Sequence, residues 1–347
     1  MKQVAVIFGG YSPEHSISLE SAHAVITHLD RSRYAVLPIG INREGRWFYY
    51  AGEAGKIADG TWQGDAQCFP AVLCPDRGQA AVYVQKPEGV QRLTADAVFP
   101  VLHGRFGEDG TVQGLIALAG LPLVGCGVLA SALCMDKDRA HKLVKEAGIA
   151  VPRGVCLHSK TEAPQAEKLG REIGYPLFVK PLRAGSSFGI RRVKSETQLT
   201  AALQEAFLYD QSVIVEEAIE GFEVGCAIMG RERLTVGEVD EIETHGDLFD
   251  FTEKYTLKNS AIHVPARLSA ADRERVQHTA KTIYRALDCA GFARVDMFFT
   301  PRGRIVFNEV NTIPGFTEHS RFPGMMRAAG LDFGAMLTQL VEEASVQ

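Results

Sequence analysis

Apolar and polar positions alternate along the first third of the chain in a pattern that predicts short buried strands separated by helices. Apolar runs that end at a glycine or a polar turn occupy residues 2–10, 34–41 and 96–104. Residues 18–29 and 111–120 instead carry apolar side chains at helical spacing. Strands that alternate with helices indicate an α/β fold with a parallel sheet that helices cover on both faces.

Two regions of this first third are less regular. Residues 51–95 are rich in glycine, proline and polar residues, which predicts irregular connections with one short strand at 80–85. Residues 121–127, LPLVGCG, predict a further strand.

The remainder of the chain predicts two more units. A helix after Met135 is expected to stop at Gly148, and a glycine- and serine-rich loop at 182–190 separates apolar strands at 175–181 and 212–219. The final unit is expected to contain three strands, a helix, a β-hairpin and a terminal helix, at residues 224–229, 234–242, 260–264, 269–288, 291–311 and 331–345.

Composition excludes several classes of protein. Of the 347 residues, 46% are hydrophobic and 23% are charged, so the chain can bury a sizeable core. The 37 Lys and Arg and 42 Asp and Glu residues give a net charge of −5, which argues against a nucleic-acid partner. No apolar run approaches the roughly 18 residues of a membrane span, and the N-terminus lacks a signal-peptide pattern. Seven cysteines without a C-x-x-C pair favour a cytoplasmic protein with reduced thiols.

The segment 176–189, PLFVKPLRAGSSFG, is the first candidate for chemistry. A strand delivers Lys180 and a glycine- and serine-rich loop follows at once, so backbone N–H groups and the ammonium can surround phosphate oxygens. No G-K-[ST] sequence closes the loop, so this is not a Walker A motif. A surface turn with a solvated lysine is the alternative that this segment leaves open.

Two acidic patterns follow. Residues 213–223 end a strand with Glu216 and Glu217, which either bind an adenine amino group and ribose hydroxyls or form a charged strand end. Residues 292–311 predict a hairpin that presents two carboxylates and an amide on one face, with Arg294 beside the first of them. Hard oxygen ligands of this kind suit Mg²⁺ bound to triphosphate oxygens. These three groups are Asp296, Glu309 and Asn311.

Together these patterns imply ATP–magnesium chemistry without a P-loop, and the chain resembles the ATP-grasp superfamily. Within it, the chain is similar to the D-alanine–D-alanine ligase family over essentially its whole length. The matching blocks, in the family's order, are GGYSPEHSIS (9–18), HGRFGEDGTVQG (103–114), MDKDRAHKL (135–143), VKPLRAGSS (179–187), VEEAIEGFEVG (215–225), EKYTL (253–257) and ARVDMFFTPRGRIVFNEVNTIPGFTEHSRFP (293–323).

The resemblance implies an ATP-grasp fold of three domains. These are an N-terminal Rossmann-like domain (1–134), a central domain (135–223) and a C-terminal domain (224–347) with a lid at 241–260, with ATP between the last two. The implied reaction has two steps: the carboxylate of D-alanine attacks the γ-phosphate, and the amine of a second substrate then displaces phosphate from D-alanyl phosphate. The family also implies two Mg²⁺ ions, with Mn²⁺ possible, and a homodimer built through the N-terminal domain.

The resemblance assigns roles residue by residue. Glu14 matches the acid that holds the ammonium of the first D-alanine, and His103 matches the histidine beside the reacting carboxylate. Ser186 and Tyr255 match the pair that joins Glu14 across three domains when the lid closes, and Lys254 matches the γ-phosphate lysine of that lid.

Further roles complete the implied active site. Arg294 and the amide of Gly315 match the pair that stabilises the tetrahedral oxyanion, and Ser320 is grouped with the catalytic residues. Ser16 stands where the family often has an acid, which puts only the hydrogen bonding of that loop in doubt. The implied nucleotide contacts are Lys137, Lys180, Glu216, Glu217, Ile219, Glu223 and Lys254, and the implied metal ligands are Asp296, Glu309 and Asn311.

The second substrate is the finer question. Tyr255 is typical of ligases whose acceptor is an amine, whereas ligases that make D-alanyl-D-lactate lack this tyrosine. Arg321 stands where housekeeping ligases usually carry an aliphatic residue. The lid LFDFTEKYTLK and the ending SRFP resemble the VanG-type D-alanine–D-serine ligases, which implies that Phe249 and Arg321 line the acceptor pocket and that the chain serves vancomycin resistance. A housekeeping D-alanine–D-alanine ligase is the alternative.

Two other classes fit less well. A nicotinamide oxidoreductase would need G-x-G-x-x-G after the first strand, and the sequence lacks it. A non-catalytic relative acting as a regulator would be expected to lose some of the phosphate, metal and oxyanion residues. All of these are present: Lys180, Arg294, Asp296, Glu309 and Asn311.

Overall fold

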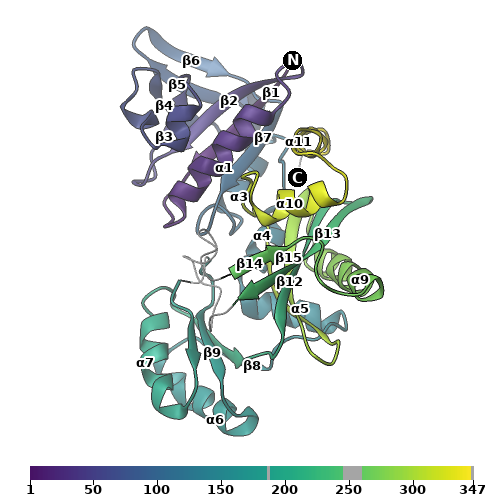
Figure 1. The fold of residues 1–347 in the computed structure, drawn as a ribbon. Helices are drawn as coiled ribbons and strands as arrows, with labels where there is room; N and C mark the ends of the chain where they lie inside the picture. The colour runs from purple at the N-terminus through teal and green to yellow at the C-terminus, as the bar shows by residue number, and fades with distance from the viewer. Residues whose placement is uncertain (186–187, 245–259, 345–347) are drawn as a thin grey trace.

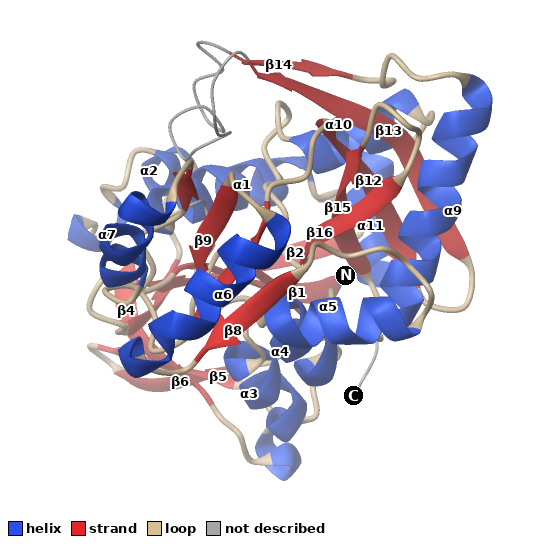
Figure 2. Ribbon diagram, turned by 90° about the horizontal axis from the view of Figure 1, so that it is seen from below, coloured by secondary structure: helices blue, strands red, loops and turns tan. Residues whose placement is uncertain are grey.

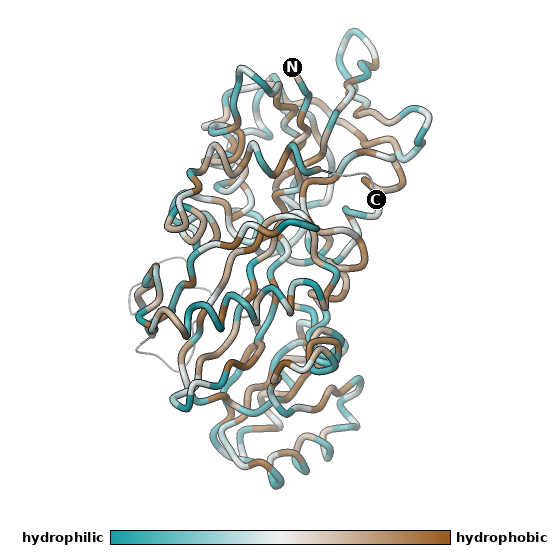
Figure 3. Tube along the Cα trace, turned by 90° about the vertical axis from the view of Figure 1, so that its right-hand side faces the viewer, coloured by the Kyte–Doolittle hydropathy of each residue, from teal (hydrophilic) through white to brown (hydrophobic). Residues whose placement is uncertain are grey.

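In the computed structural model, residues 1–185, 188–244 and 260–344 are described, and these residues form three β-sheets. Each sheet is built from strands that are consecutive in the chain. In Figure 1 the first sheet is purple to blue, the second teal, and the third green to yellow. Hydrophobic and hydrophilic stretches alternate along the chain in Figure 3.

The first sheet has the described order β6-β5-β4-β3-β2-β1-β7. Strand β1 pairs in parallel with β2 and β7, but the pairs from β2–β3 to β5–β6 are antiparallel. The prediction of a parallel sheet is therefore right for three strands only. The strands are β1 (Lys2–Gly9), β2 (Tyr34–Ile41), β3 (Trp47–Tyr50), β4 (Cys68–Leu73), β5 (Val82–Lys86), β6 (Gly89–Leu93) and β7 (Ala97–Leu102).

The difference has a physical cause. Short turns at 42–46 and 87–88 join β2 to β3 and β5 to β6, and a short turn can only reverse the chain. Strand β6 has hardly any buried residue, so it carries no apolar pattern that would have revealed it. The strand expected at 121–127 is reduced to a single bridge between Leu123 and Val98.

Helices pack against both faces of the β7-β1-β2 part. One face is covered with α1 (His15–His28), whose buried Leu19 and Val25 join the core beneath Phe8. The other face carries α3 (Thr111–Ala119), which buries Val112 and Ile116. The helix α2 (Gly55–Ala58) packs on α1.

The second sheet has the described order β10-β9-β11-β8 with antiparallel pairing throughout. Its apolar side chains pack against two helices, which lie over the sheet in Figure 2. The elements are β8 (Gly154–Leu157), α6 (Ala163–Ile173), β9 (Leu177–Pro181), β10 (Arg191–Val193), α7 (Glu196–Ala206) and β11 (Val213–Glu217). Two helices lead into this unit, α4 (Val128–Met135) and α5 (Lys137–Glu146).

The third sheet has the described order β14-β13-β12-β15-β16 and is also antiparallel. One face packs on α9, and α10 contacts the strands β12 and β13. Phe292, Phe316 and Phe322 pack together with Phe99 of the first sheet, which joins the two units through one core. The elements are β12 (Phe222–Gly230), β13 (Leu234–Thr244), β14 (Ser260–His263), α9 (Ala270–Ala286), β15 (Phe292–Phe299), β16 (Ile305–Asn311), α10 (Arg321–Ala328) and α11 (Phe333–Glu342).

Candidate active site

A row of acidic residues crosses the third sheet. Gly225 on β12 is the register partner of both Asp240 on β13 and Asp296 on β15, and Asp296 is in turn opposite Glu309 on β16. Residues that are directly opposite in a sheet point to the same face, so the three carboxylates gather on one surface. Such a concentration of negative charge requires cations beside it.

Arg294 and Asn311 supply two of the partners of Asp296. The Arg294 guanidinium donates to both oxygens of Asp296 over 2.7–3.1 Å, and the amide nitrogen of Asn311 donates to Oδ2 over 2.8 Å. Arg294 and Asn311 are themselves register partners, and each lies two residues along its strand from the acidic row. The sequence prediction that these residues share one face is thus confirmed for Arg294, Asp296 and Asn311.

Arg321, the first residue of α10, extends into the acidic row. Its Nε and Nη2 donate to the two oxygens of Asp240 over 2.7 and 2.8 Å, and Nη1 donates to Glu223 Oε1 over 2.8 Å. Nη2 also lies 3.3 Å from Asp296 Oδ1. Arg321 therefore joins a predicted nucleotide contact to a predicted metal ligand, with its side chain only 8% exposed.

Gly225 is what allows this approach. A Cβ atom at this position would overlap Nη2 of Arg321 and would lie 2.6 Å from Asp240 Oδ1, closer than any side chain tolerates. Asp240 was missed in the sequence because nothing near it suggests a role. Its partner is 81 residues away in the chain.

A pocket of about 540 Å³ lies between the second and third sheets. It is lined by all the predicted nucleotide residues that the structure describes, together with the predicted metal ligand Glu309. The ammonium of Lys137 donates to the carbonyl of Ala184 over 2.9 Å and lies 3.8 Å from Glu309 Oε2. The six nucleotide residues are Lys137, Lys180, Glu216, Glu217, Ile219 and Glu223.

Glu216 forms the buried end of this pocket. Burial acts to raise its pKa, but the Lys180 ammonium outweighs that effect, with help from His141 and Lys137, and the pKa lies below its usual value. Lys180 pairs with Oε1, whereas Oε2 has no hydrogen-bond donor among the described residues. A buried carboxylate oxygen without a donor suits a ligand N–H group, such as an adenine amino group.

The first-substrate residues lie at the end of β7 and in the turn before α1. The carboxylate of Glu14 is buried between two glycines, Gly104 and Gly185. Gly104 has φ +69°, and a Cβ atom there would overlap Glu14 Oε2. Gly185 belongs to the glycine- and serine-rich loop of the second unit, so Glu14 links the two units next to the predicted phosphate loop.

His103 is buried, and its hydrogen bonds indicate its tautomer. Nδ1 lies 2.9 Å from the carbonyl oxygen of Ile313, which can only accept, so Nδ1 carries the proton. Nε2 then accepts from Ser21 Oγ at 3.5 Å. Burial lowers the pKa of His103, which favours this neutral form. Ser12 Oγ donates to the His103 carbonyl and accepts from the Glu14 N–H, so both predicted first-substrate residues share one support.

Gly315 and Ser320 are close together in the loop before α10. A Cβ atom on Gly315 would lie 2.8 Å from Ser320 Oγ, so this position has no room for a side chain. Ser320 Oγ accepts from the N–H of Thr317 over 3.1 Å. The serine thus shapes the loop that carries the predicted oxyanion amide.

Four predicted residues lie outside the described residues, and their roles remain predictions. They are Ser186, Phe249, Lys254 and Tyr255. Residues 245–259, which make up most of the predicted lid, are also outside the described residues.

The predicted metal ligands offer donors of a kind that suits a divalent cation. Asp296, Glu309 and Asn311 supply two carboxylates and an amide, which are oxygen ligands that Mg²⁺ accepts. The described residues contain no group of three or more His, Cys, Asp or Glu side chains that could hold a metal by itself. The set therefore fits an ion that completes its coordination with nucleotide phosphates and water.

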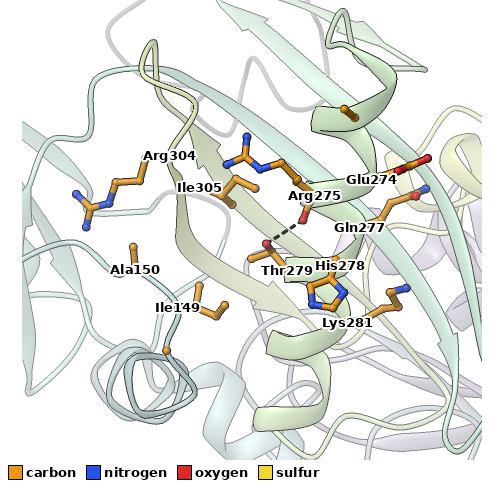
Figure 4. Close-up of a pocket in the computed structure, with 12 residues that line it drawn as sticks. Ile149, Ala150, Glu274, Arg275, Gln277, His278, Thr279, Lys281, Arg304 and Ile305 are labelled. Atoms are coloured by element: carbon orange, nitrogen blue, oxygen red, sulfur yellow. Dashed lines mark hydrogen bonds between the residues drawn. The ribbon is translucent and has the colours of Figure 1, made fainter.

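A larger hollow, of about 900 Å³, lies elsewhere and contains none of the predicted residues (Figure 4). It is bordered by α9, the residues after α5 and the β15–β16 turn. Its walls include Arg275, whose Nη2 donates to the carbonyl of Gly303, and Arg304. Volume alone therefore does not mark the site of chemistry in this molecule.

Comparisons with known proteins identify the family of the chain. Residues 3–126 match the model of the D-ala D-ala ligase N-terminus, and residues 143–342 match that of the D-ala D-ala ligase C-terminus. Among solved structures, the chain is similar to the VanG D-Ala:D-Ser ligase from Enterococcus faecalis, with 52% identity, 98% of both chains covered and a TM-score of 0.91.

Curated relatives cover the chain to the same extent. The vancomycin C-type resistance protein VanC1 of Enterococcus gallinarum is 42% identical over 342 residues, which is 98% of each chain. A D-alanine–D-alanine ligase of Caldicellulosiruptor bescii is 41% identical over 350 residues, or 99% of this chain and 94% of the relative. No helix in the described part of the chain is long and apolar enough to cross a membrane. The chain belongs to the D-alanine–D-alanine ligase family, has its ATP-grasp fold and is an ATP-dependent ligase.

Proposed function

We propose that this enzyme joins D-alanine to D-serine at the expense of ATP. The observation that carries the proposal is the buried Arg321, which Asp240 and Glu223 hold in place beside Asp296. A pocket with an aliphatic side chain at this position would favour the methyl group of D-alanine. A guanidinium can donate to a hydroxyl, and a pocket with such a donor can distinguish D-serine from D-alanine. The 52% identity to the VanG D-Ala:D-Ser ligase supports the same acceptor.

We assign the remaining roles by family resemblance, and the positions described above support them. Glu14 holds the ammonium of the first D-alanine, and His103 lies beside its carboxylate. Lys137 and Lys180 contact the phosphates, while Glu216 binds the adenine amino group and Glu223 binds the ribose. Phosphorylation gives the D-alanine carboxylate a leaving group, and the acceptor amine then attacks the carbonyl carbon and expels phosphate.

The oxyanion of this second step needs preorganised donors. We assign that task to Arg294 and the amide of Gly315, with Ser320 shaping the loop. Two divalent ions, Mg²⁺ or Mn²⁺, would be held by Asp296, Glu309 and Asn311, and would neutralise charge on the transferred phosphate. Closure of the lid over 241–260, with Ser186, Lys254 and Tyr255, would keep water from the acyl phosphate.

The biological role that we propose is the supply of peptidoglycan precursors that end in D-serine, which would confer vancomycin resistance. Similarity to the VanG D-Ala:D-Ser ligase supports the D-serine ending, and similarity to the vancomycin C-type resistance protein VanC1 supports the role in resistance. Because ATP is a substrate, we place the reaction in the cytoplasm.

We also propose a homodimer that forms through the N-terminal unit, predicted here on family resemblance. Leu118 at the end of α3 and Leu129 in α4 are 65% and 58% exposed, and Val128 beside them is 41% exposed. Apolar side chains grouped on one surface suit a protein contact. Light scattering at assay concentration tests this proposal, and a monomer would contradict it.

The acceptor is tested by product analysis. We expect the purified enzyme, given ATP, Mg²⁺ and equal D-alanine and D-serine, to make mainly D-alanyl-D-serine. Arg321→Leu should shift the product ratio toward D-alanyl-D-alanine by roughly 5–30-fold, which corresponds to loss of a hydrogen bond worth about 1–2 kcal/mol. Arg327→Leu, an exposed arginine of the same helix, is the matched control.

A housekeeping D-alanine–D-alanine ligase remains the second candidate. The 41% identity to the ligase of Caldicellulosiruptor bescii favours it. So does the geometry of Arg321, since its hydrogen bonds already use three of its five N–H groups on carboxylates. Mostly D-alanyl-D-alanine from the unmodified enzyme would establish this alternative and reject the assignment of D-serine.

A further inference from the structure

The loop from Thr312 to Phe316 is held by side chains of the N-terminal unit. Glu108, in the loop between β7 and α3, accepts from the N–H of Ile313 through Oε1 over 3.1 Å. His103 donates from Nδ1 to the carbonyl oxygen of the same residue over 2.9 Å. Both polar groups of the Ile313 backbone are therefore fixed from one direction.

A third contact holds the other end of this loop. The N–H of Phe316 donates to Ser21 Oγ over 3.2 Å, and Ser21 in turn faces His103. Gly315 lies between the two fixed residues. The direction of the Gly315 amide is thus set by side chains that are about 200 or more residues away in the chain, such as Glu108 at a separation of 205.

Glu108 is bound on its other oxygen as well. Oε2 accepts from the N–H of Gly104 over 2.8 Å, in the turn that approaches Glu14. One carboxyl group therefore connects the first-substrate turn with the loop that carries the predicted oxyanion amide. Burial and the neighbouring Glu14 carboxylate raise the pKa of Glu108 to about 8, because the group is poorly solvated.

We propose that Glu108 is a positioning residue, which aligns the loop of Ile313 and Gly315 with the first-substrate turn for the attack of the acceptor. The inference rests on the proposed role of the Gly315 amide. Alignment of this kind matters because an oxyanion donor acts only when it already points at the position that the oxyanion will occupy. A misplacement of about 1 Å in a catalytic group can cost on the order of 100-fold in rate.

Glu108→Gln is the informative substitution. The carboxyl accepts from two backbone N–H groups, whereas an amide has one oxygen and would direct its NH₂ group at one of those donors. Shape and volume are nearly unchanged, so the loop should shift without a cavity. Glu88→Gln, an exposed residue of the same unit, is the matched control.

Two reactions separate positioning from a general structural defect. With ATP and D-alanine, before D-serine is added, exchange of oxygen isotopes between the bridging and non-bridging positions of ATP reports reversible formation of the acyl phosphate, and any D-alanyl-D-alanine formed is counted as product of the second step. With the acceptor added, dipeptide formation reports the second step. We expect Glu108→Gln to lower dipeptide formation by about 10–100-fold, while isotope exchange, the KM for ATP and the melting temperature stay close to those of Glu88→Gln.

Dipeptide formation at the wild-type rate, or an equal loss of both reactions, would overturn the proposal. If Glu108→Gln does not fold, Ser21→Ala removes the hydrogen bond at Phe316 instead, and it should affect the second step in the same way but less strongly. Wild-type enzyme measured in parallel tests the proposed function separately, since absence of both reactions there concerns the ligase chemistry and not Glu108.

Discussion

Replacement of Arg321 by leucine should destabilise the protein as well as alter the product. The guanidinium contacts three carboxylates, Asp240, Glu223 and Asp296, in a place where its own side chain is 8% exposed. Removal of one partner from a buried ion pair leaves an uncompensated charge, which costs about 3–5 kcal/mol. We therefore expect the free energy of unfolding to fall by that amount, a large share of the roughly 5–15 kcal/mol that a folded domain has.

The assay is urea denaturation followed by fluorescence, with Arg327→Leu as the control for loss of an arginine from α10. The double variant Arg321→Leu/Asp240→Asn tests whether the lost stability comes from the uncompensated carboxylates. It removes one of the carboxylates that the guanidinium neutralises, so it should recover part of the lost stability, and the two effects should not be additive. A change of less than about 1 kcal/mol in Arg321→Leu, or a double variant that is less stable than the single one, would refute the account of the acidic row.

Four further predictions follow from the same geometry. Glu309→Gln should abolish turnover while the melting temperature stays near the wild-type value, and wild-type activity would contradict the assignment of Glu309 as a metal ligand. Gly104→Ala should raise the KM for the first D-alanine at least tenfold, because a Cβ atom there overlaps Glu14, and an unchanged KM would contradict this. Protease cleavage within the predicted lid, 241–260, should be suppressed by ATP with a substrate analogue, and equal cleavage would argue against closure. The pKa of Glu108 is raised to about 8, so its contribution to the free energy of unfolding is fully present below its ordinary pKa of 4.5 and is lost as pH rises toward 8. Glu108→Gln should therefore make the free energy of unfolding, measured by urea denaturation, fall less over this pH range.

Local pattern was enough to predict the hairpin that carries the predicted metal ligands. The two-residue period of a strand places Glu309 and Asn311 on one face, and a tight turn at 301–304 starts the pairing of the two strands. A shift of register between Asp296 and Met297, which the sequence did not reveal, brings Asp296 opposite Glu309. The nucleotide residues followed from family resemblance, and the described ones do line one pocket.

Contacts between distant segments were beyond such reasoning. Asp240 sits in a strand with several acidic residues, and its importance appears only when α10 brings Arg321 against it. Glu108 was recognised as part of a family block but had no role, because its partner Ile313 is 205 residues away. The mixed pairing of the first sheet was missed for a different reason: its edge strands are short and largely exposed, so burial does not leave a pattern in them.

The acidic row also connects two parts of the proposed active site that are usually considered separately. Glu223 lines the nucleotide pocket, and through Arg321 it is tied to Asp240 and to the predicted metal ligand Asp296. A nucleotide that draws Glu223 toward its ribose would pull on one hydrogen bond of the Arg321 guanidinium, and the remaining bonds to Asp240 would have to bear the change. Because Ser320 directly precedes Arg321 at the start of α10, such a shift would also move the loop of Ser320 and the proposed acceptor side. We therefore expect the choice of acceptor to depend on the nucleotide that is bound. Through the ribose contact of Glu223, the ratio of D-alanyl-D-serine to D-alanyl-D-alanine should differ between ATP and a deoxyribose analogue, and an unchanged ratio would contradict this coupling.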